Sequence, residues 1–118
     1  MTEEPTIGPL LEGYLTQRRA KITLEEYRSE VNVVDLLRGY LNRFGYTELV
    51  PAERERFDRT FFGDGNAEAF CDLYGAGDLI SRVPAFLDEY LPNRVHADPS
   101  VISFAKSVTA DLVAWLEK

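Results

Sequence analysis

Residues 23–44 read TLEEYRSEVNVVDLLRGYLNRF and carry the clearest helix signal in the chain. Thr23 and Glu26 have the T-x-x-E spacing of a capping box, in which the threonine hydroxyl accepts from the Glu26 N–H and the glutamate returns to the Thr23 N–H. Ile22 and Tyr27 stand at the positions of a hydrophobic staple. We therefore predict a helix over residues 23–44, about 33 Å long at 1.5 Å per residue.

Apolar side chains recur along this helix at steps of three and four residues. One stripe consists of Tyr27, Val31, Val34, Leu37, Leu41 and Phe44, and Leu24, Val33, Leu36 and Tyr40 extend it. They cover more of the circumference than one neighbouring helix could bury, so we expect this helix at the centre of the fold. Gly45 is placed to end it in a left-handed cap. Glu30 falls within the apolar arc, and the sequence leaves open whether an arginine pairs with it or water reaches it.

The rest of the chain is also helical in its periodicity and lacks clean two-residue alternation. Further helices are predicted over residues 9–20 and 51–62, in a short segment capped by Asn66, in a segment capped by Asp78 or Ser81, and after Asp98. Pro84 is expected in the first turn of its helix, because further in it would remove a backbone hydrogen bond.

The length of 118 residues suits one domain covering residues 1–118, with one candidate subdomain break near residues 63–66, where the chain reads GDGN. The loops between the predicted helices are short. We therefore predict an all-α fold, an orthogonal or bundle-like array of about five to six helices around the helix over residues 23–44.

Charge and hydropathy restrict the partners and the compartment. The formal net charge is −7, and the first 60 residues carry 9 of the 13 basic side chains. This balance disfavours attraction of the whole molecule to nucleic acid or to an anionic membrane. No apolar run approaches the roughly 18 to 20 residues of a membrane span, and Met1–Pro5 is acidic where a signal peptide would be basic. We expect a cytoplasmic protein with no membrane partner.

A single cysteine and a single histidine remove most metal and nucleophile chemistry. Cys71 can form neither an internal disulfide nor a cysteine zinc cage, and no basic residue within four positions lowers its pKa. His96 alone cannot supply a histidine metal site. We therefore predict no catalytic residue, no cofactor and no metal, and a chain that is not an enzyme. The remaining enzyme hypothesis uses carboxylates in a pocket between helices.

The segment Asp64-x-Asn66-x-Glu68 has the oxygen spacing that begins a calcium loop. The match fails at the sixth and twelfth positions, where Ala69 and Gly75 replace the required glycine and glutamate. A turn followed by a helix cap is the prediction here.

Six basic residues of the first half are the candidate nucleic-acid contacts. They are Arg18, Arg19, Lys21, Arg28, Arg38 and Arg43. The densest group crosses the join between the first two helices. Solvated charge is the simpler interpretation, and a ridge that contacts phosphates is the alternative.

The stretch Ile22–Val31, followed by Leu36, Leu37, Tyr40, Leu41 and Phe44-Gly45-Tyr46, resembles the N-terminal core-binding (SAM-like) helical domain of phage-integrase-type tyrosine recombinases. In that family a Thr-x-x-x-Tyr-Arg start leads into a helix that ends in a Tyr-Leu and glycine pattern. The resemblance covers residues 9–46 and implies a helical domain that clamps DNA by its backbone. The family's catalytic arginines and tyrosine lie in a separate domain without a counterpart in residues 1–118, so no recombinase activity is implied.

Two functional hypotheses follow. The leading one is a non-enzymatic protein–protein interaction or adaptor domain, which binds a protein partner or forms a homodimer through apolar surface left on its long helices. The alternative is a nucleic-acid-binding accessory protein that uses the six basic residues.

Overall fold

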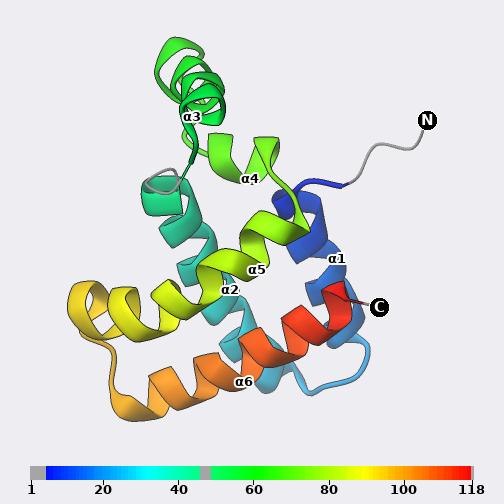
Figure 1. Ribbon diagram of the computed structural model, residues 1–118. Coiled ribbons are helices and arrows are strands. Elements are labelled where there is room, and N and C mark those ends of the chain that lie inside the picture. Colours follow the sequence, from blue (N-terminus) through cyan, green and yellow to red (C-terminus); the bar gives the residue numbers. More distant parts are fainter. Residues whose placement is uncertain (1–4, 46–48, 118) are drawn as a thin grey trace.

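The computed structural model describes residues 5–45 and 49–117. This part of the chain forms α1 (Ile7–Arg19), α2 (Leu24–Phe44), α3 (Pro51–Asp58), α4 (Ala69–Leu73), α5 (Ala76–Ala85) and α6 (Pro99–Leu116), and two π-helical segments, η2 (Arg59–Gly63) and η3 (Phe86–Val95), continue α3 and α5 (Figure 1). Among the described residues no strand forms, and the only β pairing is an isolated bridge between Thr6 and Gly75. The all-α prediction is confirmed.

The central helix begins where the sequence predicts. Thr23 is the N-cap of α2, and its Oγ1 accepts from the Glu26 N–H at 3.2 Å. α2 contacts α1, α4, α6 and η3, so it meets neighbours on several sides. Val34, Leu37 and Leu41 are almost fully buried, whereas Leu24 in the first turn is 57% exposed. The apolar arc is therefore used along most of α2 but not at its start.

The end of α2 differs from the prediction. Gly45 is right-handed, with φ −58° and ψ −30°, so the predicted left-handed cap is wrong. The glycine serves close packing instead: a Cβ at this position would lie 2.9 Å from two ring carbons of Phe70. The Gly45 carbonyl also accepts from Arg82 Nε at 3.1 Å. The contact with Phe70 joins the end of α2 to α4, and the hydrogen bond from Arg82 joins it to α5.

The start of α5 and the place of its proline also differ. The helix begins at Ala76 with Gly75 as N-cap, and not at the predicted caps. Pro84 is its next-to-last residue and does not lie in the first turn. The proline stands at the junction with η3, where the backbone changes its hydrogen-bond register and the missing N–H interrupts a pattern that is ending.

The predicted N-caps of α6 and α4 differ in how well they match the structure. Asp98 is the N-cap of α6, as predicted, although its side chain forms no capping hydrogen bond. Asn66 lies ahead of α4 and is not its N-cap; its Oδ1 accepts from the Glu68 N–H at 2.9 Å and closes a turn. Local turn chemistry thus replaces the helix cap that the sequence suggested at Asn66.

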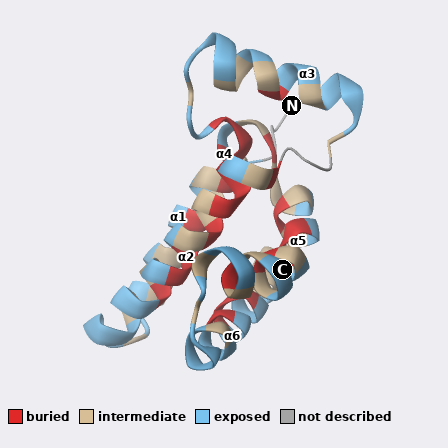
Figure 2. Cartoon of the chain, turned by 90° about the vertical axis from the view of Figure 1, so that its left-hand side faces the viewer, coloured by how far each residue is buried: buried red, intermediate tan, exposed pale blue. Residues whose placement is uncertain are grey.

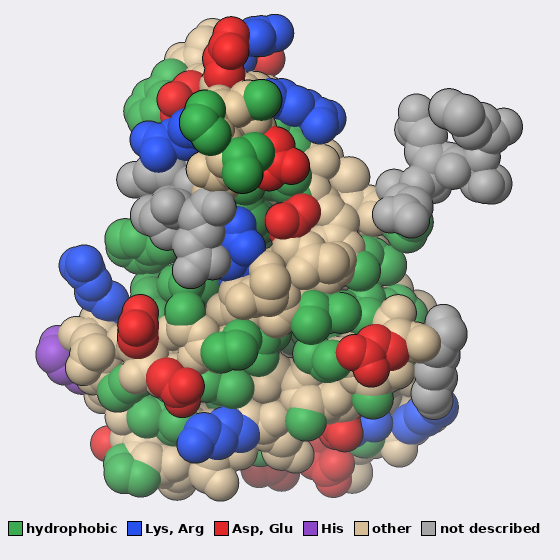
Figure 3. All heavy atoms as spheres, in the orientation of Figure 1, with side chains coloured by type: hydrophobic (Ala, Val, Ile, Leu, Met, Phe, Trp, Pro, Cys, Tyr) green, Lys and Arg blue, Asp and Glu red, His purple; other side chains and the backbone are tan. Residues whose placement is uncertain are grey.

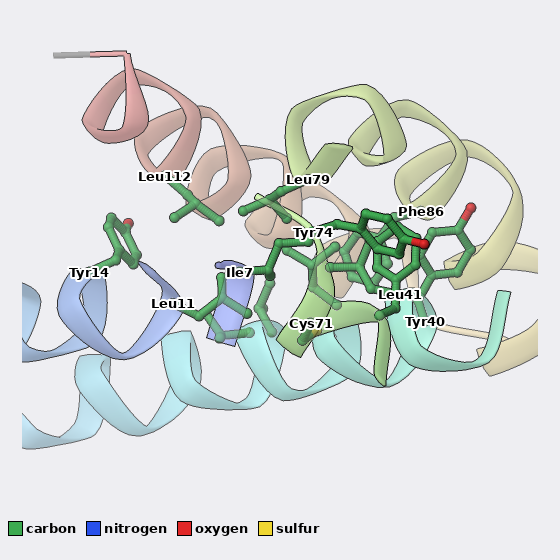
Figure 4. Close-up of a cluster of buried hydrophobic side chains, with 14 of the residues drawn as sticks. Ile7, Leu11, Tyr14, Tyr40, Leu41, Cys71, Tyr74, Leu79, Phe86 and Leu112 are labelled. Carbon is green, nitrogen blue, oxygen red and sulfur yellow. The ribbon is translucent and has the colours of Figure 1, made fainter. Parts of the chain in front are cut away.

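The core lies between two layers of helices. α1 and α2 form one layer, and α5 with η3 and α6 form the other (Figures 1 and 2). Ile7 and Leu11 of α1 and Leu79 and Leu112 of the opposite layer point into the space between them (Figure 4), and all four are fully buried. α4 closes one end, while α3 stands outside with mostly exposed side chains (Figure 2). In the described ranges, no helix has the length and apolar character that crossing a membrane requires.

Candidate functional site

The six predicted basic residues lie in different surroundings. Arg18 turns to Glu30, with Nε 3.0 Å from Oε1, and Arg38 lies 4.0 Å from Glu68 on the α4 side. The Arg19 guanidinium lies 5.8 Å from the centre of the Tyr27 ring. The remaining three, Lys21, Arg28 and Arg43, are exposed. The exposed basic charge at the α1–α2 turn is therefore separated from the basic charge further along α2.

Glu30 is the centre of a buried polar network, which answers the question that the sequence left open. The side chain of Glu30 is bonded by Arg18 through both Nε and a terminal guanidinium nitrogen, at 3.0 to 3.3 Å. Tyr14 adds its hydroxyl at 3.3 Å. The hydrogen bonds that Arg18 donates to Glu30 raise the pKa of Arg18, and burial, followed by the Glu30 charge, raises the pKa of Tyr14. This network fastens α1 to α2 and serves the fold.

One cleft between helices is lined by carboxylates, as the enzyme hypothesis requires. It has a volume of about 240 Å³ and is lined by Gly8, Pro9, Glu12, Arg38, Glu68, Cys71 and Asp72. Burial raises the pKa of the Cys71 thiol to about 12, so the thiol is neutral near pH 7 and is a poor nucleophile. Arg38 Nε is buried and makes no hydrogen bond to any described residue. The cleft thus combines carboxylates and one guanidinium without an activated nucleophile.

The other residues with metal or base chemistry lie apart. His96 is exposed at the C-cap of η3, in a left-handed conformation with φ 56°. Across residues 5–45 and 49–117, no three His, Cys, Asp or Glu side chains come together in an arrangement that could hold a metal ion.

A second cleft lies beside the C-terminal end of α2. It has a volume of about 370 Å³ and is lined by Tyr40, Phe44, Glu89, Tyr90, Asn93 and Arg94. The Tyr40 and Tyr90 rings are 5.0 Å apart, and the Arg94 guanidinium lies 5.4 Å from the centre of the Phe44 ring. The chain's own arginine therefore already covers one aromatic face of this cleft.

A third, mainly apolar depression lies on the outer side of the second layer. α5 with η3 runs antiparallel to α6, and the two form a helical hairpin (Figure 1). Between them is an open groove of about 440 Å³, which we call the hairpin groove; it is lined by Val83, Leu87, Lys106, Thr109, Ala110, Val113, Ala114 and Glu117. Hydrophobic side chains gather over α5, η3 and α6 on this face, with isolated charges among them (Figure 3). Five of its eight lining residues are apolar.

Sequence reasoning did not identify this groove. Ala105, Val108 and Leu112 form the stripe by which α6 docks on the core, and all three are buried. Val113 and the exposed Ala110 and Ala114 lie on a different face of α6. Their signal was an apolar character that continues around the helix beyond the docking stripe, which a search for a second face would have found.

In comparisons with protein-family models, curated proteins and solved structures, no match to this chain was found.

Proposed function

We propose that this chain is a non-enzymatic protein-interaction domain that binds its partner through the hairpin groove. One observation carries the proposal: two antiparallel helices leave between them a groove with mainly apolar walls that no described segment fills. Soluble domains rarely leave continuous apolar surface uncovered unless a partner covers it. A helix laid into such a groove is a common mode of recognition.

Two other clefts suit an apolar partner less well than the hairpin groove does. Glu12, Glu68 and Asp72 outnumber Arg38 in the cleft at Cys71, so the net charge there disfavours an anion, and the neutral thiol is a poor nucleophile. In the aromatic cleft Arg94 already lies over the Phe44 ring. Binding in the hairpin groove needs no such displacement, because its apolar walls are open to solvent and gain free energy when a partner removes water from them.

Site-specific photo-crosslinking in the cells that express the protein tests this proposal. A photoreactive amino acid replaces Ala110 in the groove, and the matched control carries it at Ala52, an exposed alanine of α3. Discrete adducts are expected at position 110 and not at position 52. Absence of any adduct at position 110, or the same adducts at both positions, contradicts the proposal.

A second candidate function is binding of a nucleic acid at the α1–α2 turn. It is supported by the exposed cations Arg19, Lys21 and Arg28, and by the resemblance of this segment to a recombinase core-binding domain. Titration with duplex DNA in about 50 mM salt should show binding that weakens steeply as salt rises. Arg28→Ala should weaken it, whereas Arg56→Ala on α3 should not. No binding at that salt concentration would end this hypothesis.

A further inference from the structure

We propose that the partner in the hairpin groove is a second copy of this chain, and that the two copies pair with their α6 helices antiparallel. The inference rests on the proposed function and names the partner for the same surface. It starts from the positions on α6 that line the groove: Lys106, Thr109, Ala110, Val113, Ala114 and Glu117. These positions are symmetric about the midpoint between residues 111 and 112. A two-fold axis through that midpoint therefore places Lys106 opposite Glu117, Thr109 opposite Ala114, and Ala110 opposite Val113 of the other copy.

The charges of this face fit such a pair. Lys106 and Glu117 are separated by about three helical turns, or roughly 16 Å, so they lie on the same face at the two ends of the groove. Neither forms an ion pair with any residue in the described part of the chain. In an antiparallel pair each lysine meets the glutamate of the other copy, and the contact occurs twice. A parallel pair would bring like charges together, which opposes association.

The side chains between these charges permit close approach. Ala110 and Ala114 are small and exposed, so a second helix can approach α6 to the usual interaxial distance of about 8 to 10 Å. Val83 and Leu87 form the opposite wall of the groove and would contact the second copy's α6 from the side. Each copy contributes one hairpin, and two hairpins packed in this way make a four-helix bundle. Every apolar residue of the groove is then covered by the same set from the other copy.

Charge reversal tests both the partner and the orientation. Sedimentation equilibrium of the wild-type protein at about 100 μM should show a dimer. Lys106→Glu and Glu117→Lys should each weaken self-association, on the order of tenfold, because each places like charges at both symmetric contacts. An equimolar mixture of the two variants should recover the dimer, since both contacts are then attractive, and so should the double variant. Arg56→Glu, the same reversal of charge at an exposed residue of α3, which lies away from the groove, should leave association unaltered.

The outcomes separate this inference from the proposed function. A monomeric wild-type protein, or a mixture that associates no better than the single variants, overturns the antiparallel pair. If the crosslinked adduct at position 110 has the mass of this chain joined to a different protein, the groove is an interaction site but the second copy is not its partner. An adduct of twice the chain mass, together with recovery in the mixture, supports both.

Discussion

Removing Arg18 alone should destabilise the protein far more than removing both members of the Arg18–Glu30 pair. Only 4% of Glu30 is exposed, and its carboxylate depends on Arg18 at 3.0 to 3.3 Å. Breaking a buried ion pair from one side costs about 3 to 5 kcal/mol because the remaining charge loses its partner. The Arg18 side chain is 29% exposed, so water can enter after its removal, and we expect Arg18→Met to cost about 3 kcal/mol, the lower end of that range.

The complementary changes complete a double-mutant cycle. Glu30→Met should cost less, about 1 to 2 kcal/mol, because the partly exposed guanidinium can turn to solvent while the Tyr14 hydroxyl loses one acceptor. The double variant replaces a buried ion pair with apolar side chains, a change that is often close to neutral, so its cost should stay near 1 kcal/mol. The sum of the two single effects would then exceed the double effect by about 3 to 4 kcal/mol.

Urea denaturation measures this difference directly. With a denaturant slope of about 1 to 3 kcal/mol per molar, a loss of 3 kcal/mol lowers the midpoint by roughly 1 to 3 M. Tyr14→Phe is the matched control, because it removes a single hydrogen bond to Glu30 and should cost about 1 kcal/mol. Additive effects of the two methionine substitutions would refute the argument, since they would show that the side chains do not stabilise each other.

Three further predictions concern single residues. Gly45→Ala should lower stability by about 1 to 3 kcal/mol, because the new Cβ would lie 2.9 Å from an aromatic ring. Gly39→Ala should raise stability by about 0.5 to 1 kcal/mol, because no atom lies within 4 Å of the new Cβ and alanine favours the helix. Thermal unfolding of both variants distinguishes crowding from helix propensity. Thr23→Ala should cost about 1 kcal/mol in urea denaturation, but Asp98→Ala only a few tenths, because only the threonine side chain forms a capping hydrogen bond; equal losses would contradict this account. The pKa of the Cys71 thiol is about 12 in the folded protein against about 9 when unfolded. The buried neutral thiol therefore contributes its full stabilisation of the folded state below pH 9, and this stabilisation is lost as the pH rises toward 12. The urea midpoint of Cys71→Ala should fall less than that of the wild type between about pH 8 and pH 11.

Local chemistry explains which features could be predicted from sequence. The predicted capping bond of Thr23 depends on residues within one turn of each other, and it is present. The pairing of Glu30 with Arg18 spans two helices, so the sequence could show only that a carboxylate lies on an apolar face. The same holds for Gly45, whose close neighbour Phe70 belongs to a distant segment of the chain.

The candidate groove was missed because the sequence was interpreted with a single helical period. Between residues 78 and 90 the α-helical period places Phe86, Leu87 and Tyr90 on the apolar face, but Leu87 and Tyr90 are only half-buried. Phe86 is fully buried, and so is Leu91, five residues further along the chain. Five residues is the hydrogen-bonding step of a π-helix, which brings these two positions to one side, whereas an α-helix would turn one of them away from the core. The change of period after Pro84 therefore moves Leu87 out of the inward set. That change makes Leu87 part of the groove wall opposite α6, so the local backbone geometry of η3 creates the surface on which the proposed interaction depends.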